Sequence, residues 1–158
     1  MKPPRILIVD DEPLIRQSLA GVLQDEGYQT HAVATGEECC EELNRSPFAL
    51  VLLDVWLPGM DGLETLARIQ ERPFADRPVV VIISGHGTIE TAVKATKLGA
   101  FDFIEKPLTI EKVSVVVKNA IQQHRLELEL ERFKENGRAH PQIIGESVPA
   151  SASSNGCP

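Results

Sequence analysis

The sequence has no apolar run that approaches the ~18–20 residues needed to cross a membrane. Its first residues, MKPPRILIVDDE, reach charged side chains too early for a signal peptide. We therefore expect a soluble, cytoplasmic chain that makes no membrane contact.

Basic residues are also scarce. The chain has 16 Lys and Arg against 23 Asp and Glu, and its formal net charge is −7. Proteins that hold nucleic acid neutralise its phosphates with clustered basic side chains. This balance argues against direct binding of nucleic acid by this chain.

Cysteine is too rare for disulfide bonds to stabilise the fold. There are three cysteines, and two of them, Cys39 and Cys40, are adjacent, so they form no disulfide framework. No CxxC or HxxxH spacing indicates a zinc site, and no GxGxxG motif follows the first apolar run, which argues against a dinucleotide-binding fold. We expect the cysteines to be small, half-buried residues in a reducing compartment.

What the sequence does have is a regular alternation of two patterns. The chain has 158 residues, 42% of them apolar, which is enough for one domain with a real core. Short apolar runs without a polar face predict strands covered on both sides, and apolar residues at helical spacing lie between them. Strands are expected at 5–10, 28–34, 49–54, 78–84 and 101–105, and helices near 13–27, 36–45, 63–70, 88–98 and from 109 onward. Five alternations predict an α/β fold with a parallel sheet, helices on both faces and right-handed crossovers.

Polar side chains end four of these strands. Asp10 and Asp11 follow the first run, Asp54 ends the third, Ser84 ends the fourth and Lys106 follows the fifth. The carboxyl ends of parallel strands form the edge at which such sheets bind ligands. Crowded carboxylates repel one another unless a cation lies among them, and magnesium prefers oxygen ligands with room for water.

This set of residues suits phosphoryl chemistry. An aspartate that attacks phosphorus forms an acyl phosphate, and Asp54 is the candidate nucleophile. Lys106 supplies a point positive charge for a phosphoryl oxygen, and Ser84 supplies a hydroxyl for the same group. The Lys106–Pro107 bond is a candidate cis bond that would fix where the lysine points.

The last helix is expected to continue beyond the domain. Leu126, Leu130 and Phe133 are spaced four and three residues apart, which is typical of a short heptad seam. Two heptads are too few to be stable alone, so we expect a dimer helix or a signalling linker. The alternative is a solvated, charged helix end with incidental leucines.

The motifs IVDDE, LLDVWLPGMDG, VIISGHGT and FDFIEKP together resemble the signatures of the two-component response-regulator receiver domain, over residues 5–120. The resemblance implies a flavodoxin-like, doubly wound, five-stranded sheet of order 2-1-3-4-5. It also implies that Asp54 is the phosphoacceptor and that Mg²⁺ (or Mn²⁺) is the cofactor. The metal would be held by Asp11, by Asp54, by the backbone carbonyl of Trp56 and, through water, by Asp10.

The same resemblance implies a switch. Lys106 would hold the phosphoryl group, Ser84 would swing toward it, and Phe103 would rotate inward behind it. Residues 88–117 would form the output face. The implied partners are a sensor histidine kinase and a second copy of the chain, bound through the last helix and the output face. Such a chain accepts a phosphoryl group and hydrolyses it itself, without being a turnover enzyme.

The segment TIETAVKATKLGAFDFIEKPL resembles a narrower group, the receivers of sigma-54-dependent regulators of the NtrC and NtrX type. The IIGES at 143–147 resembles the opening of the AAA+ ATPase domain of those regulators, but no GxxxxGK[ST] loop and no helix-turn-helix is present. We therefore expect a receiver domain at 1–122, a helical linker and possible coiled coil at 123–136, and a disordered tail or truncated AAA+ start at 137–158. A piece of a longer protein is favoured over a natural truncation, and ATP hydrolysis and DNA binding are assigned to the presumed parent.

Two rival interpretations stay open. A phosphatase of the haloacid-dehalogenase type also uses an aspartyl nucleophile, but it requires a second acid two residues later, where this chain has Trp56. Turnover of p-nitrophenyl phosphate would support that alternative. The other rival is a stand-alone receiver that acts by docking on another protein, which the downstream reading frame would settle.

Overall fold

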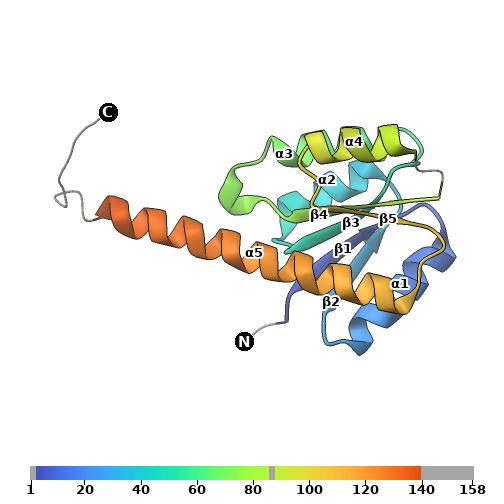
Figure 1. Cartoon of the computed structure of the whole chain (residues 1–158), viewed down its shortest axis with the longest axis horizontal. Coiled ribbons are helices and arrows are strands. Elements are labelled where there is room, and N and C mark those ends of the chain that lie inside the picture. Colours follow the sequence, from blue (N-terminus) through green and yellow to red (C-terminus); the bar gives the residue numbers. More distant parts are fainter. Residues whose placement is uncertain (1–2, 86–87, 140–158) are drawn as a thin grey trace. The chain divides into compact units, whose positions relative to one another are not determined.

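The computed structural model describes residues 3–85 and 88–139, with side chains in the last helix described as far as Phe133 (Figure 1). Strands and helices alternate along the chain as the sequence predicts. The elements are β1 (Arg5–Val9), α1 (Pro13–Asp25), β2 (Gln29–Val33), α2 (Gly36–Arg45), β3 (Leu50–Asp54), α3 (Gly62–Gln70), the 3₁₀ helix η1 (Phe74–Asp76), β4 (Val79–Ser84), α4 (Ile89–Lys97), β5 (Asp102–Glu105) and α5 (Ile110–Ala139).

The five strands form one parallel sheet in the order β2-β1-β3-β4-β5, which confirms the predicted flavodoxin-like topology. After β2 the chain returns to the other side of β1 and builds β3, β4 and β5 outward from there. The direction of winding therefore reverses between β1 and β3. In open α/β sheets a ligand crevice forms outside the carboxyl ends of the strands at this reversal.

Helices cover both faces of the sheet, which explains why its central strands are apolar without interruption. Alternate residues of β1 point to opposite faces: Leu7 and Val9 belong to one core cluster, and Ile6 and Ile8 to the other. The first cluster is completed by side chains of α2, α3 and α4, and the second by side chains of α1 and the beginning of α5. Figure 1 shows these helices on the two sides of the sheet.

Threonines cap three of the helices. Thr35 Oγ1 accepts a hydrogen bond from Glu38 N (3.1 Å), and Thr88 Oγ1 accepts one from Thr91 N (3.1 Å). Thr109 Oγ1 accepts one from Lys112 N (3.2 Å). Each bond satisfies one N–H group that has no partner within its helix. The predicted starts of α2, α4 and α5 are confirmed.

One of the two described cysteines lies deeper than the predicted half-buried position. Cys39 is buried, Cys40 is half-buried, and neither of these described cysteines forms a disulfide. Burial raises the pKa of the Cys39 thiol to about 12, which keeps it protonated. Cys157 lies outside the described residues.

The chain divides into two compact units, Met1–His124 and Arg125–Pro158. In the second unit the described residues continue α5, which ends at Ala139. Leu126, Leu130 and Phe133 are exposed there, by 52%, 56% and 77%. Residues 140–158, for which a disordered tail or a truncated AAA+ start is predicted, lie outside the described residues. Across the described helices, none has both the length and the apolar character that a membrane span demands.

Candidate functional site

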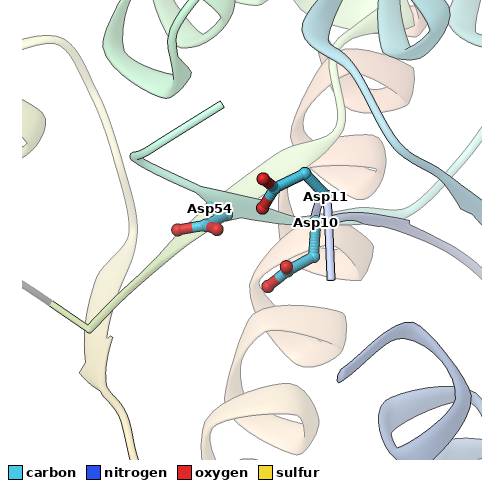
Figure 2. Close-up of side chains that lie close together, drawn as sticks. All are labelled: Asp10, Asp11 and Asp54. Carbon is cyan, nitrogen blue, oxygen red and sulfur yellow. The ribbon is translucent and has the colours of Figure 1, made fainter. Parts of the chain in front are cut away.

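Three aspartates meet at the carboxyl ends of β1 and β3 (Figure 2). One carboxylate oxygen from each of Asp10, Asp11 and Asp54 lies within 4.8 Å of the other two. Asp10 and Asp54 are 1% and 3% exposed, whereas Asp11 is exposed to solvent. The cluster therefore combines two buried carboxylates with one that solution can reach.

Local backbone geometry orients both buried carboxylates. Asp10 Oδ1 accepts a hydrogen bond from Glu12 N (2.9 Å), and Asp54 Oδ1 accepts one from Trp56 N (3.3 Å). An aspartate at the end of a strand commonly makes this bond to the backbone two residues later. In both residues the second oxygen, Oδ2, faces the ammonium group of Lys106.

Lys106 brings a single positive charge to the cluster from the end of β5. Its Nζ lies 3.1 Å from Asp10 Oδ2, 3.2 Å from Glu12 Oε1 and 3.5 Å from Asp54 Oδ2. The backbone N–H of Lys106 donates to Ser84 O (2.8 Å), and the Lys106–Pro107 bond is cis. Glu12 is the residue of this group that sequence reasoning missed. The available signal was its place as the third consecutive acid after β1.

The surroundings of Asp54 and Lys106 shift the pKa values of both groups. Burial is the main cause that raises the pKa of Asp54, and the charge of Asp10 adds to it. Lys106 opposes both effects, and the resulting pKa of Asp54 is about 6. Burial lowers the pKa of Lys106, but the ion pair with Asp10 and the charge of Asp54 outweigh it, so the net pKa of Lys106 is raised. The lysine is therefore a fixed cation, and the cluster carries more negative than positive charge.

The raised pKa of Asp54 predicts a pH dependence of stability in metal-free buffer. Between its ordinary pKa of 3.8 and about 6, the folded state binds more protons at this carboxyl than the unfolded state does. The Asp54 contribution to the free energy of unfolding therefore falls by about 3 kcal/mol as pH rises through this window, and it is constant above it.

Asp54→Asn isolates that contribution, because asparagine stays neutral. In EDTA, we expect the variant to gain stability relative to wild type as pH rises from 4 to 7 in urea titrations. A stability difference that does not change with pH would contradict the raised pKa.

A divalent cation fits this donor set. Asp10 Oδ2 is buried and lies near the Lys106 charge, yet no donor in the described part of the chain is aligned to give it a hydrogen bond. Buried carboxylate oxygens need a partner, and one lysine does not neutralise three converging aspartates. Oxygen-only ligands, one of them open to water, suit Mg²⁺ or Mn²⁺.

A small cavity opens onto this cluster. Its volume is about 260 Å³, and it is lined by Asp11, Glu12, Asp54, Trp56, Gly85 and Lys106. Trp56 is 62% exposed and lies on the cavity wall, two residues after Asp54. Two hollows elsewhere in the described structure are larger, about 490 and 310 Å³, but neither is lined by any of the three aspartates. The cluster of aspartates, and not the volume of the cavity, identifies the site.

The two residues predicted to form a switch lie on neighbouring strands. Ser84 is 1% exposed at the end of β4, and Phe103 is half-buried on β5, where it packs against the core cluster of α2, α3 and α4. Ser84 pairs with Glu105 in the sheet register, and Phe103 pairs with Ile82. Their movement, and the roles of the remaining site residues, stay predictions.

The sequence and the fold are similar to those of known proteins. Residues 6–118 match the family model of the response regulator receiver domain. The chain is 43% identical over 145 residues to the nitrogen assimilation regulatory protein NtrX of Azorhizobium caulinodans, covering 90% of this chain and 32% of that protein.

Solved structures of receiver domains are also similar to this chain. The receiver domain of NtrX from Brucella abortus is 43% identical with a TM-score of 0.69, over 74% of this chain and 98% of that one. The beryllofluoride-activated NtrC4 receiver domain dimer is 39% identical with a TM-score of 0.72, over 78% and 99%. The chain spans about a third of the length of the curated NtrX relatives that it matches.

Proposed function

Because the chain belongs to the response regulator receiver domain family, we propose that it is the phosphoacceptor of a two-component phosphorelay and that Asp54 receives the phosphoryl group from a sensor histidine kinase. The observation that carries this proposal is the setting of Asp54. Its carboxylate is buried at the end of β3, is oriented by Trp56 N, and lies 3.5 Å from a lysine in a cavity open to solution.

In the proposed step, a carboxylate oxygen of Asp54 attacks phosphorus. A P–O bond forms to Asp54, the bond from phosphorus to the donor histidine nitrogen breaks, and that nitrogen keeps the electron pair. The charge on the phosphoryl oxygens must be stabilised during the transfer. Lys106 provides a cation for this purpose, and the Ser84 hydroxyl provides a hydrogen bond.

The acidic cluster is the proposed cation site. Asp11 and Asp54 would bind Mg²⁺ or Mn²⁺ directly, together with the backbone carbonyl of Trp56, and Asp10 would act through water. A cation held there would neutralise charge on the transferring phosphoryl group. Receiver domains generally bind Mg²⁺ through such acidic residues, and the cluster here has the donors that this requires.

Signalling would follow from a shift between two conformations that exist before phosphorylation. Ser84 and Phe103 would link the phosphoryl group to a face made by α4, β5 and the start of α5. Exposed apolar side chains support a docking role for this face: Ile89 is 86% exposed, Val93 46% and Val115 58%.

We propose dimerisation through this face and through the continuation of α5. Exposed Leu126, Leu130 and Phe133 support that role for the helix. The corresponding division is a receiver at 1–122, a helical linker and possible coiled coil at 123–136, and a disordered tail or truncated AAA+ start at 137–158. The proposal includes a cytoplasmic location and control of a sigma-54 output that these residues do not contain.

A turnover phosphatase is a weaker candidate. It requires a general acid two residues after the nucleophile, and Trp56 has no acidic group. We infer that the acyl phosphate is lost by slow self-hydrolysis, so that the chain stores a signal and does not process a substrate.

Incubation with acetyl phosphate and magnesium, followed by intact-mass measurement and light scattering, tests the function. We expect a mass gain of one phosphoryl group, because acetyl phosphate supplies the group without a kinase. EDTA should reduce labelling on the order of a hundredfold or more, because the clustered carboxylates then repel the anionic donor. A protein that stays unlabelled with magnesium would contradict the proposal, and light scattering reports any accompanying change in size.

A further inference from the structure

Glu12 lies immediately before α1, at the position where a short polar side chain often caps a helix. None of the described N–H groups of α1 donates to its side chain. The carboxylate instead reaches the end of β5, where Oε1 accepts a hydrogen bond from Lys106 Nζ (3.2 Å). A residue placed to cap a helix is thus bonded to a side chain 94 positions away.

Lys106 also contacts Asp10 and Asp54, but these two carboxylates are buried, whereas that of Glu12 is exposed. Asp10 and Asp54 are buried, and each is fixed by a backbone N–H at its other oxygen. The Glu12 side chain is 58% exposed and lines the cavity. An ammonium group has three donor hydrogens, and here three carboxylates surround it.

An incoming phosphoryl group competes with these three carboxylates for the ammonium group of Lys106, and only the contact with Glu12 is a hydrogen bond. Glu12 is the partner most easily displaced, because its exposed carboxylate is hydrated when the contact with Lys106 breaks. The carboxylates of Asp10 and Asp54 are buried, so water cannot replace Lys106 as their partner.

We propose that Glu12 is a positioning residue for Lys106. In the unphosphorylated protein its carboxylate holds the ammonium group at the cavity wall, and phosphoryl transfer to Asp54 requires that this contact break. The inference rests on the proposed function, and it adds a residue that competes with the phosphoryl group for the lysine.

The first test measures labelling rates with acetyl phosphate. Magnesium is raised for each variant until the rate no longer changes, because removing a nearby negative charge weakens cation binding. An exposed ion pair corresponds to about a two- to fivefold change in an equilibrium. We expect Glu12→Gln to be labelled about two- to fivefold faster than wild type. Glu71→Gln, which neutralises an exposed glutamate at the end of α3, should match wild type.

Glu12→Asp separates contact from charge. Aspartate keeps the negative charge near the cavity, but its side chain is one methylene shorter and caps helices well. If the contact with Lys106 matters, this variant should be labelled as fast as Glu12→Gln. If Glu12 acts only by repelling an anionic donor, it should match wild type, and the proposal is overturned.

A second readout needs neither metal nor phosphoryl group. NMR relaxation at the Lys106 ε-carbon of the metal-free protein should show a lower order parameter in both Glu12 variants. Glutamine offers the ammonium only a neutral acceptor in place of a carboxylate, and aspartate is one methylene shorter. Unchanged mobility, or mobility gained without faster labelling, would overturn the proposal. A wild-type protein that is never labelled would instead contradict the proposed function, and the NMR result would still report on the contact.

Discussion

Asp54→Asn is expected to abolish phosphoryl labelling, with a loss on the order of a thousandfold or more in rate. The amide has no anionic oxygen to attack phosphorus, and the structure offers no equivalent replacement among the described residues. Asp10 is buried and does not line the cavity. Asp11 lines the cavity, but it is exposed and has no ion pair with Lys106. Intact-mass measurement after incubation with acetyl phosphate and magnesium follows the effect directly.

The matched control is Asp76→Asn, which removes an exposed carboxylate in η1. It should be labelled at the wild-type rate, because this residue takes no part in the acidic cluster. Because Asp54→Asn removes a buried charge, its folding should not suffer, and a urea titration at pH 7 checks this. Labelling that survives in a folded Asp54→Asn protein would refute the assignment of the nucleophile.

Gly62→Ala is expected to cost about 3 kcal/mol in the free energy of unfolding. Gly62 is the buried first residue of α3, and it lies against the end of β3. A Cβ atom at this position would collide with the backbone oxygen of Asp54 and would lie 2.6 Å from Val55 Cα. These are backbone atoms that cannot rotate away, so either α3 or the strand end that carries Asp54 must move.

Gly21→Ala is the control for this substitution. Gly21 lies within α1, and no described atom outside its own helix and its chain neighbours lies within 4 Å of an added Cβ. Alanine is the better helix former, so this variant should gain up to about 1 kcal/mol. Urea unfolding of the two variants in parallel measures both effects. A Gly62→Ala protein as stable as wild type would show that the contact between α3 and β3 is looser than the structure indicates.

Much of the fold follows from local patterns in the chain. The run from Leu50 to Leu53 has no polar face and is too short for a helix, so it predicts a strand covered on both sides. Thr35, Thr88 and Thr109 mark helix starts because their hydroxyls bond to N–H groups only three residues away. The strand order does not follow from local patterns, because alternation of strands and helices predicts a parallel sheet but leaves several strand orders open. The motifs at the strand ends indicated the order through their resemblance to a family.

The sequence by itself therefore determined which segments become strands and helices, and which polar residues lie at the strand ends. Both properties depend on residues that are neighbours along the chain. Only the tertiary structure decided that Glu12 meets Lys106, that burial and Asp10 raise the pKa of Asp54, and that Gly62 must lack a side chain. Each of these depends on distances between segments far apart in sequence. Such distances are set by strand order, by the pairing of β5 with β4 and by how α3 packs on the sheet, which no local period encodes.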